Sequence, residues 1–241
     1  MIDPRISVIA ERLKGIRNII AVSSGKGGVG KSLIASTMAL ALARRGYRVG
    51  LFDLDFTSPS THVILDAGDL YPEEDNGIVP PKVHGLKYMS IVYYAREYAL
   101  PLRGADISNA LIELLAVTRW NTLDFLIIDM PPGISDATLD LLRFIKGVKF
   151  LIITTPSSLA FESVKKLIGL LLELKTPVIG VIENMKIKES PFIRQQVEDR
   201  RIKFWGEVPF DSHLEEAIGD VNKLLETKFS KKLGELVEKN L

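Results

Sequence analysis

The sequence contains no cysteine, which excludes disulfides, a thiol nucleophile and any cysteine-ligated metal centre built by this chain alone. Its histidines are few and scattered, at His62, His84 and His213. No uninterrupted apolar run reaches the ~18 residues that a membrane-spanning helix needs. The charged N-terminal stretch is no signal peptide, so we expect a cytoplasmic protein. A net charge of +1 indicates neither nucleic acid nor an anionic membrane as the first-choice partner.

The 241 residues fit one α/β domain, and 46% hydrophobic residues are enough for a large core. Strand and helix patterns alternate without repeats or a linker, which predicts a single, mostly parallel twisted sheet with helices on both faces. We expect an N-terminal helix within residues 1–16, a core over 17–217 and a C-terminal helical tail over 218–241. Residues 65–82, rich in turn formers and acids, are predicted to be a surface loop.

The individual elements follow from hydrophobic periodicity and from glycine and proline positions. The predicted strands are Ile19–Val22, Arg48–Asp53, Leu86–Val92, Leu123–Asp129, Phe150–Thr154, Pro177–Ile182 and Phe204–Val208. The predicted helices are Ile6–Ile16, Lys31–Arg45, Ala105–Thr118, Leu159–Leu174, Leu214–Ile218 and Phe229–Asn240.

The stretch Gly25–Ser32, GKGGVGKS, directly follows the first predicted core strand and fits the phosphate-loop pattern. Glycines let backbone N–H groups approach phosphate oxygens without an obstructing Cβ atom. Lys31 supplies a charge for the β- and γ-phosphates, and the Ser32 hydroxyl is a Mg²⁺ ligand. The helix that starts at Lys31 adds its positive N-terminal dipole. We therefore predict nucleotide binding by Gly25, Gly27, Gly28, Val29, Gly30, Lys31 and Ser32.

Acidic residues end two of the predicted strands, where open α/β sheets bind ligands. Asp129 closes an apolar strand before Pro-Pro-Gly, which is the Walker B arrangement for Mg²⁺. Asp53 and Asp55 close another, and one would join the Mg²⁺ shell while the other orients water. A polar strand end before the turn FTSPS explains these two nearly as well.

Two further segments have two readings each. Asn184 directly follows a predicted strand, so it either reads the nucleotide base through its amide or simply occupies a strand-to-loop turn. The C-terminal apolar stripe from Leu224 to Val237 has helical spacing, which suits packing against the sheet or a membrane-surface helix. Packing is the commoner use of such a stripe. The basic stretch from Arg194 to Lys203 is interrupted by acids, as a solvated surface would be.

Lys26, a second lysine in the glycine loop, resembles the deviant phosphate loop of the MinD, ParA and nitrogenase-iron-protein superfamily. A closer resemblance is to Mrp/ApbC-type ATPases. It is carried by LDFLIIDMPPGISDATLDL (123–141), VIGVIENM (178–185), FDLDFTSPS (52–60), GEVPFDSHLEEA (206–217) and GIVPPKVHGLKYMSI (77–91). The match runs from about Arg17 to Ala217.

That resemblance implies ATP and Mg²⁺ as cofactors and slow ATP hydrolysis that toggles a homodimer with ATP at its interface. Lys26 would reach the nucleotide of the second subunit and, with Lys31 and Asp55, take part in catalysis, Asp55 by positioning water. Ser32, Asp53 and Asp129 would lie around Mg²⁺. Asn184 and the Pro209 backbone would hold the adenine.

The chain departs from that family at one place. The family's iron–sulfur carriers have Cys-x-x-Cys after Glu-Asn-Met, whereas this chain continues with Lys186-Ile187-Lys188 and no cysteine. We therefore expect no iron–sulfur cluster on this chain alone, unless a cysteine-bearing paralogue or assembly protein supplies ligands.

The leading hypothesis is an ATP-switched homodimer working in metal-centre assembly. The alternatives are a MinD/ParA-like positioning ATPase acting on membrane or DNA, and a regulatory subunit that binds nucleotide but barely hydrolyses it.

Overall fold

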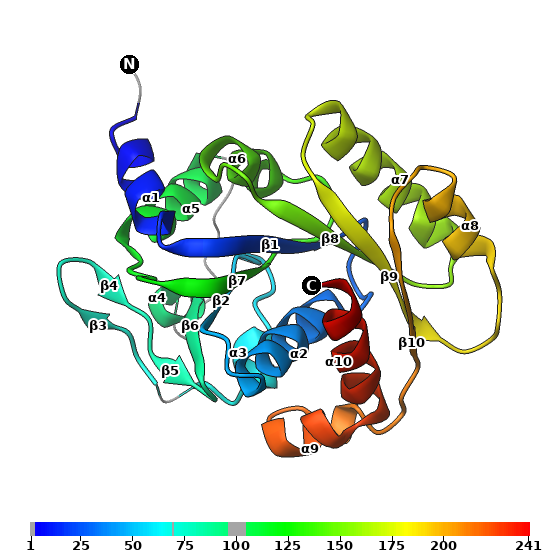
Figure 1. The fold of residues 1–241 in the computed structure, drawn as a ribbon. Coiled ribbons are helices and arrows are strands. Elements are labelled where there is room, and N and C mark those ends of the chain that lie inside the picture. The colour runs from blue at the N-terminus through cyan, green and yellow to red at the C-terminus, as the bar shows by residue number, and fades with distance from the viewer. Residues whose placement is uncertain (1–2, 69, 96–104) are drawn as a thin grey trace.

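A computed structural model describes residues 3–68, 70–95 and 105–241. Its centre is one eight-stranded sheet of order β10-β9-β8-β1-β7-β2-β6-β5, parallel throughout except for the antiparallel β5–β6 pair (Figure 1). The strands are β1 (Ile16–Ser24), β2 (Val49–Asp53), β5 (Lys82–Val83), β6 (Leu86–Ser90), β7 (Leu123–Asp129), β8 (Lys149–Thr154), β9 (Val178–Lys186) and β10 (Phe204–Pro209). A separate two-stranded hairpin joins β3 (Glu73–Glu74) to β4 (Ile78–Val79).

Helices cover both faces of this sheet (Figure 1). One face carries α1 (Arg5–Leu13), α5 (Ala105–Val117), α6 (Asp136–Phe144), α7 (Ser158–Glu173) and α8 (Phe192–Glu198). The other carries α2 (Lys31–Arg44), α3 (Thr61–Ile64), α9 (Val221–Glu226) and α10 (Lys228–Asn240). The short helix α4 (Val92–Ala95) follows β6, and a 3-10 turn, η1 (Glu215–Ala217), precedes α9. The predicted fold class, a single-domain mostly parallel α/β sheet, is confirmed.

Alternating side chains on each strand explain why two cores form. In β1, Ile19 and Ala21 join the cluster under α1, α5 and α7, whereas Ile20 and Val22 join the cluster under α2 and α10. Because both faces are buried, the central strands are almost continuously apolar rather than alternating. This explains the near-continuous apolar run of β7.

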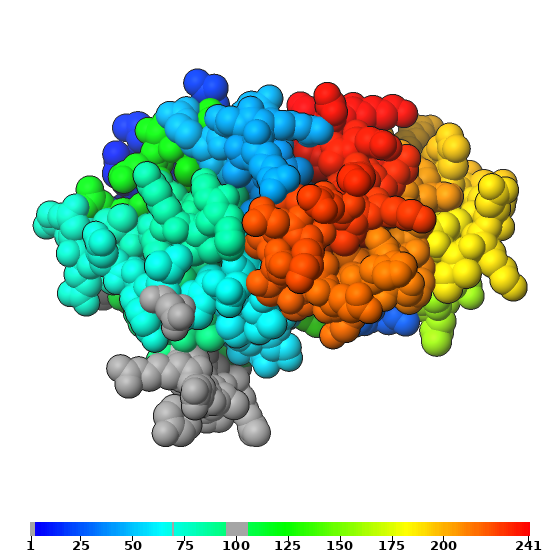
Figure 2. All heavy atoms as spheres, turned by 90° about the horizontal axis from the view of Figure 1, so that it is seen from below, coloured from blue at the N-terminus to red at the C-terminus, as the bar shows by residue number. Residues whose placement is uncertain are grey.

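The C-terminal stripe packs on the sheet. Phe229, Leu233 and Val237 of α10 are buried in the core cluster that includes Met38 of α2. Figure 2 shows α2, α9 and α10 side by side on this face. Packing is thus the use that the structure makes of this stripe. Within the described ranges, no helix is both long and apolar enough to cross a bilayer.

Several predicted boundaries were wrong because pairing with neighbours decides them. Strand β1 begins at Ile16, so the first helix ends at Leu13 rather than at Ile16. Strand β9 continues to Lys186 because β10 pairs alongside its second half. The helix expected at Leu214–Ile218 is only the 3-10 turn Glu215–Ala217.

Several described elements, among them the short helices α3, α4 and α9, were not predicted. The predicted loop 65–82 contains the hairpin β3–β4 and reaches β5. Arg12 donates to the Asn76 carbonyl at 2.8 Å, and Arg119 pairs with Asp75 Oδ2 at 2.6 Å. These long-range contacts hold the hairpin, and no local pattern reveals them. Helices α6 and α8 were also missed.

Candidate functional site

The glycine loop connects the end of β1 to the start of α2. Gly28 and Gly30 have φ of +77° and +79°, a left-handed backbone that side-chain-bearing residues rarely adopt. Gly30 is also the N-cap of α2, whose Ile34 amide donates to the Gly30 carbonyl at 3.0 Å. The loop therefore presents backbone N–H groups at the positive end of a 14-residue helix, a geometry that suits phosphate oxygens.

A pocket of about 480 Å³ opens over this loop. It brings together most of the predicted phosphate-binding residues with Asp55, and it adds residues that the sequence did not single out. The lining is Ser24, Lys26, Gly27, Gly28, Val29, Gly30, Lys31, Ser32, Leu33, Asp55, Thr57, Ser58, Ser60, Ile64 and Pro132. The carboxyl ends of β1 and β2 and the segment after β7 meet here, as expected for a ligand site in a parallel sheet.

The Lys31 ammonium lies beneath the pocket in a buried ion pair. Its Nζ is 2.6 Å from Asp129 Oδ1, 3.3 Å from Ser32 Oγ and 3.9 Å from Asp55 Oδ2. Asp129 is fully buried, and burial raises the pKa of its carboxyl. Its second oxygen, Oδ2, has no hydrogen-bond partner among the described residues. A buried, unpartnered carboxylate oxygen beside a serine hydroxyl fits a divalent cation, which prefers such ligands.

Asp53 is fully buried, although its place at the end of a strand suggested a carboxylate that faces the ligand. Both of its carboxylate oxygens accept hydrogen bonds from protein donors: Oδ1 from the Asp55 amide at 3.0 Å, and Oδ2 from Thr61 Oγ1 at 2.6 Å. Burial, followed by the charge of Asp129, raises the pKa of Asp53 to about 7. Within the described residues, no group of three or more histidine, cysteine or acidic side chains is arranged to hold a metal ion. A cation here would need phosphate or water ligands as well.

The two carboxylate oxygens of Asp55 have different neighbours: one accepts hydrogen bonds from its own loop, and the other faces the Lys31 ammonium. Its Oδ1 accepts from Thr57 Oγ1 at 2.8 Å and from the Ser58 amide at 3.1 Å. Its Oδ2 lies 3.9 Å from Lys31 Nζ. The sequence FTSPS after Asp55 therefore supplies the donors that fix this carboxylate, a role that was not predicted for those residues.

Asn184 is placed differently from the prediction. It lies within β9 rather than directly after a strand, is 2% exposed, and donates through Nδ2 to the Val29 carbonyl at 2.9 Å. A Cβ atom on Gly30 would come within 2.4 Å of this nitrogen. Asn184 thus fastens the glycine loop to β9. Neither Asn184 nor Pro209, the last residue of β10, lines the described pocket.

Glu183 and Met185, the residues on either side of Asn184, belong to a different set of contacts. Glu183 is buried and accepts from Lys186 Nζ at 2.8 Å, and Lys186 also lies 3.2 Å from Glu207 Oε1. Met185 has a φ of +59°, which breaks the strand's alternation and lets both residues of the pair meet. The Lys186–Glu207 ion pair ties the end of β9 to β10.

The segment after Asp129 is anchored to the end of β1, directly before the glycine loop. The Gly133 amide donates to the Ser24 carbonyl at 2.8 Å, and Pro132 lines the pocket. Helix α6 then starts under a cap in which Ser135 Oγ accepts from the Thr138 amide at 3.3 Å. The Pro-Pro-Gly segment therefore lies against the end of β1, and it borders the pocket over the glycine loop. Lys26 is exposed at the rim.

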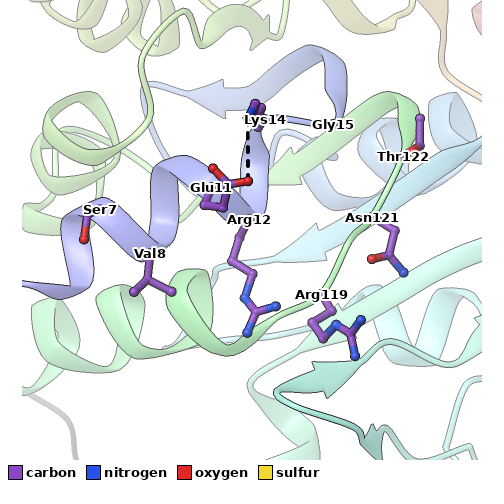
Figure 3. Close-up of a pocket in the computed structure, with 9 residues that line it drawn as sticks. All are labelled: Ser7, Val8, Glu11, Arg12, Lys14, Gly15, Arg119, Asn121 and Thr122. Atoms are coloured by element: carbon purple, nitrogen blue, oxygen red, sulfur yellow. Dashed lines mark ion pairs between the residues drawn. The ribbon is translucent and has the colours of Figure 1, made fainter.

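A larger pocket, of about 750 Å³, lies at the opposite end of the sheet (Figure 3). It is bounded by α1, by Gly15 before β1 and by Thr122 before β7, at the amino ends of the strands. Its arginines, Arg12 and Arg119, are the two that hold the β3–β4 hairpin. Size alone does not make it the nucleotide site, because it has no phosphate loop.

Comparison with known proteins gives consistent results. The model of a family described as NUBPL iron-transfer P-loop NTPase, of the ParA group, matches residues 15–240. The iron-sulfur cluster carrier protein of Aquifex aeolicus is 38% identical over 190 residues, 77% of this chain and 52% of that protein. The carrier protein of Saccharolobus solfataricus is 35% identical over 223 residues, 86% of this chain and 75% of that protein. The chain spans about half the length of the first bacterial relatives it matches.

Solved structures show the same fold. A nucleotide-binding protein from Archaeoglobus fulgidus, in complex with ADP, has a TM-score of 0.77 and 32% identity, covering 92% of this chain and 93% of that one. The cell division ATPase MinD of Pyrococcus furiosus has a TM-score of 0.67 and 20% identity, covering 92% and 97%. At that identity the likeness to MinD concerns the fold alone.

Proposed function

The chain belongs to the family of NUBPL iron-transfer P-loop NTPases, and from this premise we propose that it binds ATP with Mg²⁺ and hydrolyses it slowly. The observation that carries the proposal is the buried contact of Lys31 with Asp129 directly beneath a glycine loop of left-handed backbone. The loop, Lys31 and Asp55 line one pocket, and Asp129 contacts the Lys31 ammonium, an arrangement that suits phosphate binding.

Phosphate binding would use the backbone from Gly25 to Ser32 and the ammonium of Lys31. A phosphate competes with Asp129 for Lys31, so binding would release Asp129 Oδ1 and leave both of its oxygens for Mg²⁺. Ser32 Oγ would provide a direct ligand, with Asp53 in the outer shell. The bound Mg²⁺ would neutralise charge that develops on the phosphates.

Hydrolysis would depend on Asp55, whose carboxylate lines the pocket beside Lys31. Its fixed orientation suits the placement of an attacking water. Asn184 and the backbone at Pro209 are proposed to contact the adenine. For Asn184 this contact would have to use the amide oxygen, because Nδ2 is engaged with the Val29 carbonyl.

We propose that ATP holds two copies of the chain together. Lys26 is exposed at the rim of the pocket, and Lys31 would already serve the phosphates of its own subunit. A second ammonium at this rim is suited to the nucleotide of a facing copy, where it would add charge stabilisation in hydrolysis.

The cellular task is proposed to be metal-centre assembly. Relatives at 35–43% identity are named iron-sulfur cluster carrier proteins, whereas the MinD likeness stands at 20% and concerns the fold. The positioning ATPase is therefore not favoured. Because this chain has no cysteine, we propose that it carries no cluster alone and works with a cysteine-bearing partner.

The nucleotide proposal is tested by ATP binding and phosphate release in the wild type, Lys31→Ala and Lys188→Ala. Lys188 is an exposed lysine outside the pocket and serves as the matched control. We expect Lys31→Ala to lose binding and turnover while Lys188→Ala keeps both. Binding by Lys31→Ala at wild-type affinity would overturn the assignment of the loop.

The cluster proposal is tested by anaerobic reconstitution with iron and sulfide, followed by desalting. We expect no charge-transfer absorbance and no stoichiometric iron on the purified chain. A stable cluster on the homodimer would contradict the proposal, and a cluster formed only with a cysteine-bearing partner would support it.

A further inference from the structure

Three buried polar side chains form a line beneath the loop that follows β2. The Tyr88 hydroxyl lies 2.8 Å from Thr61 Oγ1, and Thr61 Oγ1 donates to Asp53 Oδ2 at 2.6 Å. All three residues are fully buried. A hydroxyl has one proton to donate, and Thr61 gives it to Asp53, so Tyr88 is the donor in its contact with Thr61.

The same carboxylate holds both ends of the loop that carries Asp55. Asp53 Oδ1 accepts from the Asp55 amide at 3.0 Å, at the start of the loop. Asp53 Oδ2 accepts from the Thr61 amide at 3.3 Å, at its end, in addition to the Thr61 hydroxyl. The orientation of the Asp53 carboxylate therefore sets where residues 55–61 lie relative to β2.

We propose that Thr61, itself oriented by Tyr88, is a positioning residue for ATP hydrolysis. It acts through Asp53 on Asp55, the carboxylate that lines the phosphate pocket. The inference rests on the proposed hydrolysis and names residues to which neither the sequence motifs nor the nucleotide proposal gave a role.

Removing a hydrogen bond from this line of contacts should lower turnover but leave nucleotide affinity unchanged. The phosphate-binding groups belong to the glycine loop and the start of α2, and neither Thr61 nor Tyr88 lines the pocket. Without the Thr61 hydroxyl, the Asp53 carboxylate loses its shortest hydrogen bond and keeps only the two backbone donors, so the Asp55 backbone is held less firmly. Since misplacing a reacting group costs rate rather than binding, turnover should fall while affinity persists.

The experiment measures kcat and the Kd for ATP in the wild type, Thr61→Val, Thr61→Ser and Thr118→Val. Valine matches threonine in shape but has no hydroxyl. Thr118 is the control, because it is also fully buried and donates to a backbone carbonyl, that of Leu114, at 2.6 Å. We expect Thr61→Val to lower kcat about tenfold, from the loss of the shortest hydrogen bond that orients Asp53. Its Kd should stay within about twofold, since phosphate binding does not use the hydroxyl.

The controls separate positioning from stability. Thr118→Val should lower the melting temperature without lowering kcat, and Thr61→Ser, which keeps the hydroxyl, should retain most of the turnover. Equal turnover in Thr61→Val and wild type would overturn the inference, as would a loss of ATP affinity that matches the loss of kcat.

Tyr88→Phe provides a second route if Thr61→Val does not fold. Losing the neutral donor to Thr61 should lower kcat about two- to tenfold, and wild-type turnover in this variant would overturn the inference. Measurements on the wild type distinguish a failure of the proposed hydrolysis from a failure of this inference. If the wild type binds ATP without turnover, the proposed hydrolysis fails and this inference with it; if it turns over ATP and the variants match it, only the inference fails.

Discussion

Lys31 Nζ lies 2.6 Å from Asp129 Oδ1, in a buried ion pair that joins the glycine loop to the end of β7. The two residues are 98 positions apart in the sequence. They meet because β1 and β7 are parallel neighbours, in register from Ile16 with Leu123 to Val22 with Asp129. The pair places an ammonium group and a carboxylate at the same end of the sheet. On nucleotide binding, the ammonium would pair with a phosphate and the carboxylate with Mg²⁺.

Asp129→Asn should remove the effect of Mg²⁺ on nucleotide binding. The amide keeps the shape of the side chain but is a poor cation ligand, so Mg²⁺ should no longer strengthen ATP binding or support turnover. We expect at least about a tenfold loss of the Mg²⁺ effect, measured by titrating ATP with and without the metal. Asp124→Asn, on the same strand but paired with Arg48, is the control and should respond to Mg²⁺ as the wild type does. An unchanged metal response in Asp129→Asn would contradict the role of Asp129.

ATP should increase the mass of the particle in solution, and Asp55→Ala should trap the larger form. Slower hydrolysis keeps ATP at the interface, so light scattering of that variant with ATP should give twice the mass found with ADP. Lys26→Ala should bind ATP but fail to dimerise, because the loop retains Lys31 for its own phosphates. Equal mass for Asp55→Ala in all nucleotide states would count against ATP-driven assembly.

The elevated pKa of Asp53 makes stability depend on pH in a defined direction. The folded protein holds a proton on Asp53 up to about pH 7, whereas the unfolded chain releases it near its ordinary pKa of 3.8. Folding therefore takes up a proton in this window. The stability it contributes is fully present below the unfolded pKa and is lost as the pH rises through about 7.

Urea unfolding of the wild type and Asp53→Asn from about pH 5 to about pH 8 tests this linkage. The free energy of unfolding of the wild type should fall relative to the variant by up to about 1.4 kcal/mol for each pH unit, then level off. A constant difference between the two proteins across this range would refute the assignment of the raised pKa to Asp53.

Gly180→Ala should strongly destabilise the fold at the edge of the sheet. A Cβ atom at Gly180 would lie 2.0 Å from the indole of Trp205, whose Nε1 donates to the Ile179 carbonyl at 2.7 Å. We expect a loss of about 3 kcal/mol in the free energy of unfolding, since the indole has to move. Gly169→Ala is the matched control, because Gly169 lies in α7 with open space at its Cβ position. That change should stabilise by about 0.5–1 kcal/mol, and equal effects of the two substitutions would contradict the packing argument.

Local patterns predicted the elements around the site well. The helix beginning at Lys31 and the strand Leu123–Asp129 were placed correctly, because a glycine loop and a buried apolar run are signals contained within a few residues. The resemblance to Mrp/ApbC-type ATPases is likewise confirmed by relatives named iron-sulfur cluster carriers. The β3–β4 hairpin was missed because long-range contacts from Arg12 and Arg119 stabilise it. Helix α6 was missed as well.

The sequence by itself determined the type of fold, the phosphate loop and the strand-end carboxylates, because each depends on residue types at short, fixed spacing. Only the tertiary structure decided what those groups contact. Asp53 is engaged by Thr61 and Asp55 through both oxygens, and Asn184 fastens the loop at Val29. The physical reason is that a buried polar group must be paired, and its partner is supplied by whichever strand or loop packs beside it. Sheet order, which no local pattern encodes, fixes those neighbours.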